Sequence, residues 1–85
     1  MSTMKTTVEI SKYPLNEDYE PPILDFINRL NAYENLTIKT NATSTQITGD
    51  YDEVMGILQK EMKASFEKYG KAIFVMKVLW GDLGI

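Results

Sequence analysis

Hydrophobic and polar positions alternate along the first part of the chain. From Met4 to Tyr13, Val8 and Ile10 fall on one side, and Glu9 and Ser11 fall on the other. A period of two residues is that of a β-strand with two different faces. We therefore expect the first strand to run from Met4 to Tyr13, and Pro14 to end it.

Two more alternating segments follow in the middle of the chain. NLTIKTN places Leu36 and Ile38 on one face, and TSTQIT does the same with Thr45 and Ile47. Only a short turn near Asn41-Ala42 separates them, so we expect a β-hairpin. Near the end, KAIFVMKVLW is apolar on both faces and predicts the last strand.

Helical spacing separates the first strand from the hairpin. Pro21 and Pro22 are tolerated only in the first turn of a helix, and the acidic segment at 16–20 suits its positive end. The apolar stripe that follows consists of Ile23, Phe26, Ile27, Leu30 and Tyr33. We expect this helix to run to about Tyr33.

A second helix is predicted between the hairpin and the last strand. Asp50 can cap it, with Glu53 three residues later, and Gly70 suits its carboxyl end. One face gathers Tyr51, Val54, Met55, Leu58, Met62, Ser65, Phe66 and Tyr69. We expect the methionines and aromatics of this stripe to lie in the core.

The order of elements, βαββαβ, predicts an α+β fold. With right-handed crossovers it gives the ferredoxin-like sandwich, a four-stranded antiparallel sheet with two helices on one face. A chain of 85 residues has room for one core, so we expect residues 1–85 to form a single domain.

Strand parity divides the side chains between the two faces of this sheet. If Val8, Ile10, Thr45, Ile47, Phe74, Met76 and Val78 face the helices, the uncovered face carries Glu9, Ser11, Tyr13, Ser44, Gln46, Thr48, Ile73, Val75 and Lys77. This set mixes large aliphatics, which are unfavourable in water as a patch, with polar groups that need partners. It predicts that a second copy of the chain, a polar ligand, or both cover the face.

Composition excludes several classes of function. The absence of cysteine and histidine removes disulfide scaffolds, thiolate or imidazole metal sites and catalytic dyads built on them, so we expect no enzyme and no metal. A net charge of −3 disfavours nucleic-acid binding. No segment resembles a signal peptide or a membrane span, which predicts a cytoplasmic protein without a membrane partner.

Three segments, VEISKYPL, STQITGDYDEVM and EKYGKAIFVMKV, resemble the small thiamin-binding family typified by the YkoF domain. The most specific part is Ser44-Thr45-Gln46-x-x-Gly49-Asp50-Tyr51, and the chain departs from the pattern at Ala42. The resemblance implies a single-domain member that binds thiamin, or its hydroxymethylpyrimidine half, in the cytoplasm. It implies no cofactor other than thiamin as ligand, and self-association through the open sheet face to a dimer or tetramer.

The candidate ligand-binding residues are Glu9, Ser11, Tyr13, Ser44, Thr45, Gln46 and Lys77. Ser and Thr hydroxyls and the Gln amide both donate and accept hydrogen bonds, which suits an aminopyrimidine edge. Glu9 would favour the thiazolium cation, and Tyr13 or Trp80 could stack on it.

Structural interpretations of the same residues remain open. The hydroxyls can be ordinary strand residues, since Thr is a good strand former, and Thr45 can face the core and line a pocket between sheet and helix. Glu9 and Lys77 can form an ion pair. The alternative function is an oligomerisation or regulatory module without a small ligand.

Overall fold

A computed structural model of the chain describes residues 4–15 and 17–84. Four antiparallel strands form one sheet in the order β2-β3-β1-β4, which is the ferredoxin-like arrangement predicted from the sequence. The elements are β1 Lys5–Pro14, α1 Glu20–Asn31, β2 Thr37–Thr40, β3 Thr45–Asp50, α2 Tyr51–Tyr69 and β4 Ala72–Trp80. Asn16, the first residue of the acidic segment before α1, lies outside the described residues.

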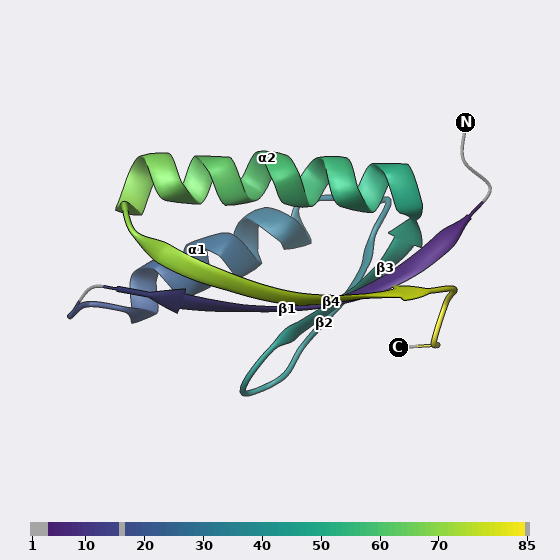
Figure 1. The fold of residues 1–85 in the computed structure, drawn as a ribbon, viewed down its shortest axis with the longest axis horizontal. Helices are drawn as coiled ribbons and strands as arrows, with labels where there is room; N and C mark the ends of the chain where they lie inside the picture. The colour runs from purple at the N-terminus through teal and green to yellow at the C-terminus, as the bar shows by residue number, and fades with distance from the viewer. Residues whose placement is uncertain (1–3, 16, 85) are drawn as a thin grey trace.

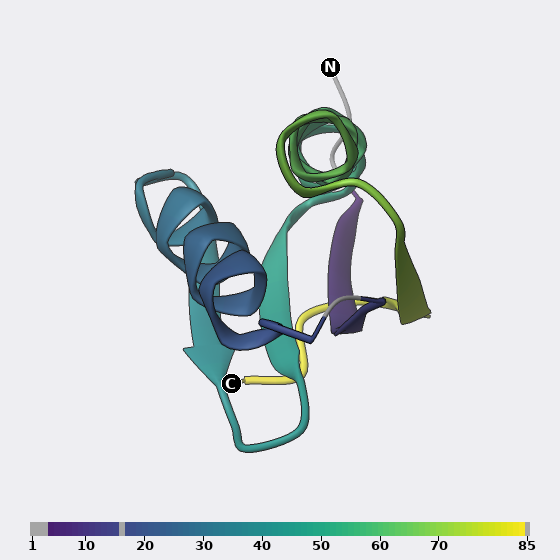
Figure 2. The same ribbon diagram turned by 90° about the vertical axis from the view of Figure 1, so that its left-hand side faces the viewer.

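Both helices lie on the same side of the sheet (Figures 1 and 2). Helix α1 packs on β1 and β2, and α2 packs on β3 and β1. Neither helix of the described chain is long and apolar enough to cross a membrane.

The core lies between the helices and the two central strands. Val8 pairs with Ile47 on one side and with Val78 on the other, which confirms the predicted parity of all three strands. The buried apolar residues are Val8, Ile10, Phe26, Leu30, Ile47, Val54 and Leu58. Each contributes about 1.5–3 kcal/mol by leaving water, so this small cluster is the main source of stability.

The open face is partly covered by the end of the chain. Residues 81–84 turn back beneath the sheet (Figure 1), where the Thr7 hydroxyl donates to the Gly81 carbonyl over 2.9 Å and accepts from the Leu83 amide over 3.3 Å. Thr48 bonds to Thr7 over 3.1 Å. Thr48 therefore lies on the open face, as predicted, but it is buried because residues 81–84 cover it. Strand parity does not predict the position of that segment.

Two helix predictions need correction. Helix α1 ends at Asn31, so Tyr33 lies beyond it, and its hydroxyl donates to a Glu61 carboxylate oxygen over 2.6 Å. In α2 the buried positions include Glu61, whereas Tyr51 and Phe66 are exposed. The expectation that the whole aromatic stripe lies in the core was wrong, because the face of α2 that packs on the sheet is narrower than the stripe.

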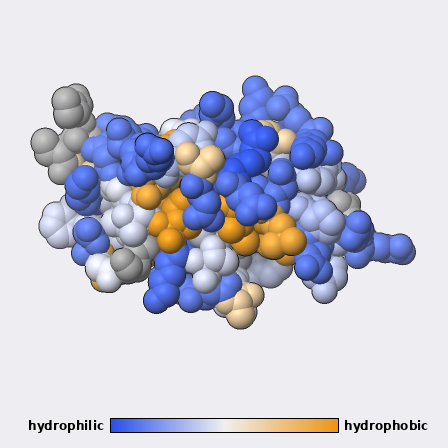
Figure 3. All heavy atoms as spheres, turned by 180° about the vertical axis from the view of Figure 1, so that it is seen from behind, coloured by the Kyte–Doolittle hydropathy of each residue, from blue (hydrophilic) through white to orange (hydrophobic). Residues whose placement is uncertain are grey.

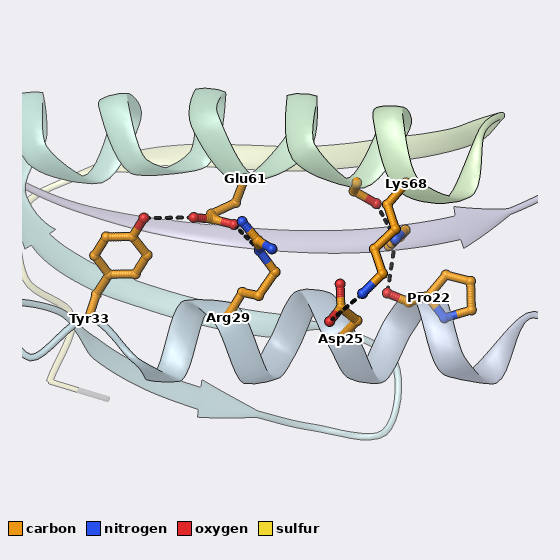
Figure 4. Close-up of polar contacts among 8 residues, drawn as sticks. Pro22, Asp25, Arg29, Tyr33, Glu61 and Lys68 are labelled. Carbon is orange, nitrogen blue, oxygen red and sulfur yellow. Dashed lines mark hydrogen bonds and ion pairs between the residues drawn. The ribbon is translucent and has the colours of Figure 1, made fainter.

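Polar side chains connect the two helices (Figure 4). Glu61 accepts hydrogen bonds from Arg29 and Tyr33, and Lys68 lies 3.6 Å from Asp25. Burial acts to raise the pKa of Glu61, but hydrogen bonds from Tyr33 and Arg29 and the Arg29 charge outweigh burial and lower it. The carboxylate of Glu61 is therefore a stabilising anion in the folded protein.

The Glu61 contacts predict a pH-dependent stability. Because the folded pKa is lowered, the stabilisation is fully present above the unfolded value near 4.5 and is lost as pH falls through the folded pKa. Glu61→Gln should lose about 1–3 kcal/mol of unfolding free energy at neutral pH. In urea titrations the difference from wild type should shrink below pH 4.5, whereas exposed Glu67→Gln should differ little at any pH. A constant difference across that range would contradict this role.

Gly49 and Gly56 form a matched pair for testing the packing between β3 and α2. A Cβ at Gly49 would lie 3.1 Å from Val54 Cγ2 and 3.2 Å from Leu36 Cδ2, whereas one at Gly56 would contact nothing within 4 Å. Gly49→Ala should cost about 1–3 kcal/mol through overpacking. Gly56→Ala, in the exposed middle of α2, should stabilise by roughly 0.5–1 kcal/mol. Chemical denaturation measures the unfolding free energy of both variants. An unchanged value for Gly49→Ala would show that Leu36 and Val54 can move aside.

Candidate functional site

Four of the predicted site residues meet on the face of the sheet that carries no helix. Glu9 lies opposite Gln46 of β3 and opposite Lys77 of β4. Its carboxylate accepts a hydrogen bond from the Ser44 hydroxyl over 3.2 Å and lies 3.6 Å from Lys77 Nζ. We refer to Glu9, Ser44, Gln46 and Lys77 as the open-face cluster.

The ion pair predicted between Glu9 and Lys77 is present in this cluster. Most of the Lys77 side chain is exposed, so solvent screens the pair and its net contribution to stability is small. Gln46 is the member of the cluster whose side chain makes neither a hydrogen bond nor an ion pair with the described residues. Its amide is half-buried and can still donate and accept.

The hydroxyl residues in and beside β3 have structural partners. Ser44 donates to Glu9, Thr45 bonds to Thr40 over 3.2 Å, and Thr48 bonds to Thr7. These bonds connect β3 to the strands on either side. The sheet thus accounts for most of the polar character of this strand without a ligand.

A pocket of about 480 Å³ lies where β3 begins and β1 continues past it. The last β1 residue paired with β3 is Ile10, opposite Thr45, whereas β1 extends to Pro14 along β4. Helix α1 and the β2–β3 turn close the space beside this free edge. The lining residues of this hairpin pocket are Ile10, Ser11, Lys12, Tyr13, Pro14, Tyr19, Ile23, Phe26, Ile27, Thr40, Asn41, Ala42, Thr43, Ser44 and Thr45.

The pocket has two chemically different walls. Helix α1 and the segment before it supply aromatic and aliphatic side chains, and the turn supplies hydroxyls and the Asn41 amide. The Ser11 hydroxyl donates to the Thr43 carbonyl over 2.9 Å and holds the turn against β1. The volume of the hairpin pocket falls within the roughly 300–1,000 Å³ that is usual for small-molecule sites. Walls that combine apolar and polar side chains are typical of such sites.

Lys12 supplies the charge closest to the hairpin pocket. Its buried ammonium donates to the Pro22 carbonyl and to the Ser65 hydroxyl, and lies 5.3–5.7 Å from the ring centres of Phe26, Tyr69 and Phe74. Burial lowers the pKa of Lys12, and the Asp25 charge opposes this only in part. The pocket lining itself contains no carboxylate.

The predicted residues thus divide between two adjacent places. Ser11, Tyr13, Ser44 and Thr45 line the hairpin pocket, and Glu9 touches its rim through Ser44. Thr45 is buried on the helix side, as its parity indicates. Gln46 and Lys77 lie along the open face, outside the lining.

Trp80 does not belong to this site. It lies opposite Thr6, whereas Tyr13 lies opposite Ile73, seven residues away along β4. At about 3.3 Å per residue, this places the two aromatics on the order of 20 Å apart. The sequence could not separate them, because it did not give the register of β4 against β1.

Sequence reasoning missed the part of the site that α1 supplies. The sequence does not single out Tyr19, and it places Ile23, Phe26 and Ile27 only in the apolar stripe of the helix. Their helical spacing shows which face turns inward but not that β3 is too short to fill the space beneath it. Within residues 4–15 and 17–84, no three acidic side chains gather closely enough to hold a metal ion.

The surface on the α1 side is not uniformly polar. Seen from behind, where α1 and β2 lie nearest to the viewer, hydrophobic residues form a band through the centre of the face (Figures 2 and 3). Hydrophilic residues border this band above and below (Figure 3).

Comparison with solved structures shows the same fold in proteins of low sequence identity. A candidate thiamine biosynthesis/salvage protein from Thermotoga maritima superposes with a TM-score of 0.83 at 18% identity, covering 95% of this chain and 88% of its own. A hypothetical protein from Methanocaldococcus jannaschii gives 0.78 at 20% identity, with 95% and 84% covered. A Streptococcus pneumoniae protein gives 0.76 at 20% identity, with 94% and 90% covered. No family model and no curated protein matches the chain.

Proposed function

We propose that this protein is a non-catalytic, YkoF-like binding protein for thiamin or its hydroxymethylpyrimidine moiety. The observation that carries the proposal is the hairpin pocket, in which aromatic side chains and hydroxyls face one space. The similar fold of the Thermotoga maritima protein, a candidate thiamine biosynthesis/salvage protein, supports the choice of ligand. A role in transport, salvage or sensing of the vitamin in the cytoplasm would need no catalytic group.

The pocket suits the aminopyrimidine half of the ligand. A flat heteroaromatic ring can lie against Tyr13, Tyr19 or Phe26, because aromatic rings stack favourably on one another. Its nitrogens and amino group need both donors and acceptors, which Asn41 and the neighbouring hydroxyls supply. Such a ring is neutral, in keeping with a lining that has no carboxylate.

The thiazolium half belongs at the rim, near the open-face cluster. The buried Lys12 ammonium disfavours a second cation deep in the pocket. Glu9 is the carboxylate that Ser44 connects to the pocket lining, so it is the group that would attract the cation. Its ion pair with Lys77 at 3.6 Å would then loosen or rearrange.

The alternative function, a module for self-association through the open face, rests on a different observation. Tyr13, Ile73, Val75 and Leu79 have the parity of the open face and are exposed there. A second copy stacked on them would bury apolar surface in a dimer or tetramer. Tyr13 also belongs to the lining of the hairpin pocket, so the two functions would share this residue.

The pocket proposal predicts stabilisation by the free pyrimidine. Hydroxymethylpyrimidine at 100 times its Kd should stabilise the fold by about 2.7 kcal/mol and raise the Tm, since it binds the folded form alone. Ala42→Trp should abolish the shift by filling the pocket, and Ala32→Trp, outside its lining, should keep it. An unmoved Tm with both thiamin and hydroxymethylpyrimidine in excess would refute the proposed function.

The rim position of the cation predicts a selective effect of Glu9. Glu9→Gln should weaken thiamin binding by about tenfold, because it removes one charge interaction of order 1 kcal/mol, and should leave hydroxymethylpyrimidine binding unchanged. Calorimetric titration of both ligands measures this difference. Glu34→Gln, which removes the same charge from an exposed position, is the matched control. Equal losses for the two ligands would show that Glu9 acts on the pyrimidine or on the fold instead.

A further inference from the structure

A second pocket lies between the end of α1 and the middle of α2. Its volume is about 320 Å³, and its lining consists of Arg29, Ala32, Tyr33, Lys60 and Glu61. None of these residues lines the hairpin pocket, and the proposed function makes no use of them. We refer to this space as the interhelix pocket.

The carboxylate of the interhelix pocket is fully engaged inside the protein. The Glu61 side chain is 3% exposed, and its two oxygens accept hydrogen bonds from Arg29 Nε and from the Tyr33 hydroxyl. Figure 4 shows this carboxylate between the two donors. Burial acts to raise the pKa of Glu61, but the hydrogen bonds from Tyr33 and Arg29 and the charges of Arg29 and Lys60 lower it. Glu61 therefore holds Arg29 in place and leaves no free acceptor for a ligand.

The two cations of the pocket keep unused donors. Arg29 has a side chain that is 44% exposed and bonds to Glu61 through Nε, so its two Nη groups make no hydrogen bond with the described residues. Lys60 is exposed and pairs with no acidic group of the described chain. Asp25, one turn before Arg29 on α1, has Lys68 as its partner at 3.6 Å. The accessible charge in the lining is therefore positive, although the net charge of the chain is −3.

The geometry points to the interhelix pocket as a binding site for a phosphate group, either the free ion or a small phosphate monoester. The two Nη groups of Arg29 form a planar fork that matches two oxygens of one phosphate. A phosphate keeps further oxygens for Lys60, which supplies the second charge from the other helix. Because Glu61 already holds the guanidinium through Nε, Arg29 loses little conformational freedom when the anion binds.

Titration of the full chain with sodium phosphate tests this site directly. Arg29 is the one arginine, so its Nε–H gives a single signal in nitrogen–proton NMR spectra. Phosphate should shift this signal and the backbone amides of Ala32 and Lys60 along one saturable curve, whereas sodium chloride at equal ionic strength should not. Glycerol phosphate distinguishes the two sources, because tighter binding than phosphate assigns the site to a monoester, and equal or weaker binding assigns it to the free ion. The absence of a saturable shift with both would overturn the inference.

Removal of single charges tests which groups hold the phosphate. Lys60→Gln should weaken binding about fivefold, because it removes one charge interaction near the surface. Lys63→Gln removes the same charge from an exposed position of α2 outside the pocket lining, so it should leave the affinity unchanged. Arg29→Lys keeps the charge but loses the fork, and should weaken binding more than about tenfold. Equal losses for Lys60→Gln and Lys63→Gln would show diffuse attraction instead of a site.

Filling each pocket in turn separates this inference from the proposed function, on which it does not depend. Ala32 is exposed and small, so Ala32→Trp should fill the interhelix pocket and abolish the response to phosphate, while stabilisation by hydroxymethylpyrimidine persists. Ala42→Trp should do the reverse. Circular dichroism verifies that each variant folds. Phosphate binding that survives Ala32→Trp would place the anion elsewhere and overturn the assignment.

Discussion

The pairing of β1 with a strand on each side is the constraint on which the rest of this structure depends. Val8 aligns with Ile47 and Val78 in one row, so the three strands share one alternation of inward and outward side chains. A shift of one residue in either pairing would turn the apolar row of a strand toward the open face. The core, the open-face cluster and the walls of the hairpin pocket all follow from this alignment.

Two buried charged side chains show how a small core accommodates polarity. Glu61 lies between the helices because Arg29 and Tyr33 both donate to it, and Lys12 lies among three aromatic rings with two oxygen acceptors. Burial of a charge is tolerated only when such partners replace water. Because Lys12 also lines the hairpin pocket, the same arrangement that holds α1 and α2 together places a positive charge at the wall of the pocket.

Unequal strand lengths create the two surfaces of interest. Since β3 begins opposite Ile10, the last part of β1 has a free edge beneath α1, and the hairpin pocket fills that place. Since β4 pairs with β1 along nine residues, it extends past the cover of the helices and exposes Met76, Val78 and Trp80. The hairpin pocket and the exposed apolar residues of β4 therefore lie on opposite sides of β1.

The sequence by itself determined the order of elements, the fold and the facing of Glu9, Ser44, Gln46 and Lys77, because alternation and helical periodicity are local properties that report burial directly. It could not show where strands end relative to one another, because that depends on pairing between distant segments. Tertiary structure alone decided that α1 forms a wall of the pocket, that Thr48 is covered by residues 81–84, and that Trp80 is far from Tyr13. The hydroxyl partners of β3 were decided in the same way, since each bond joins residues on different strands or beside them.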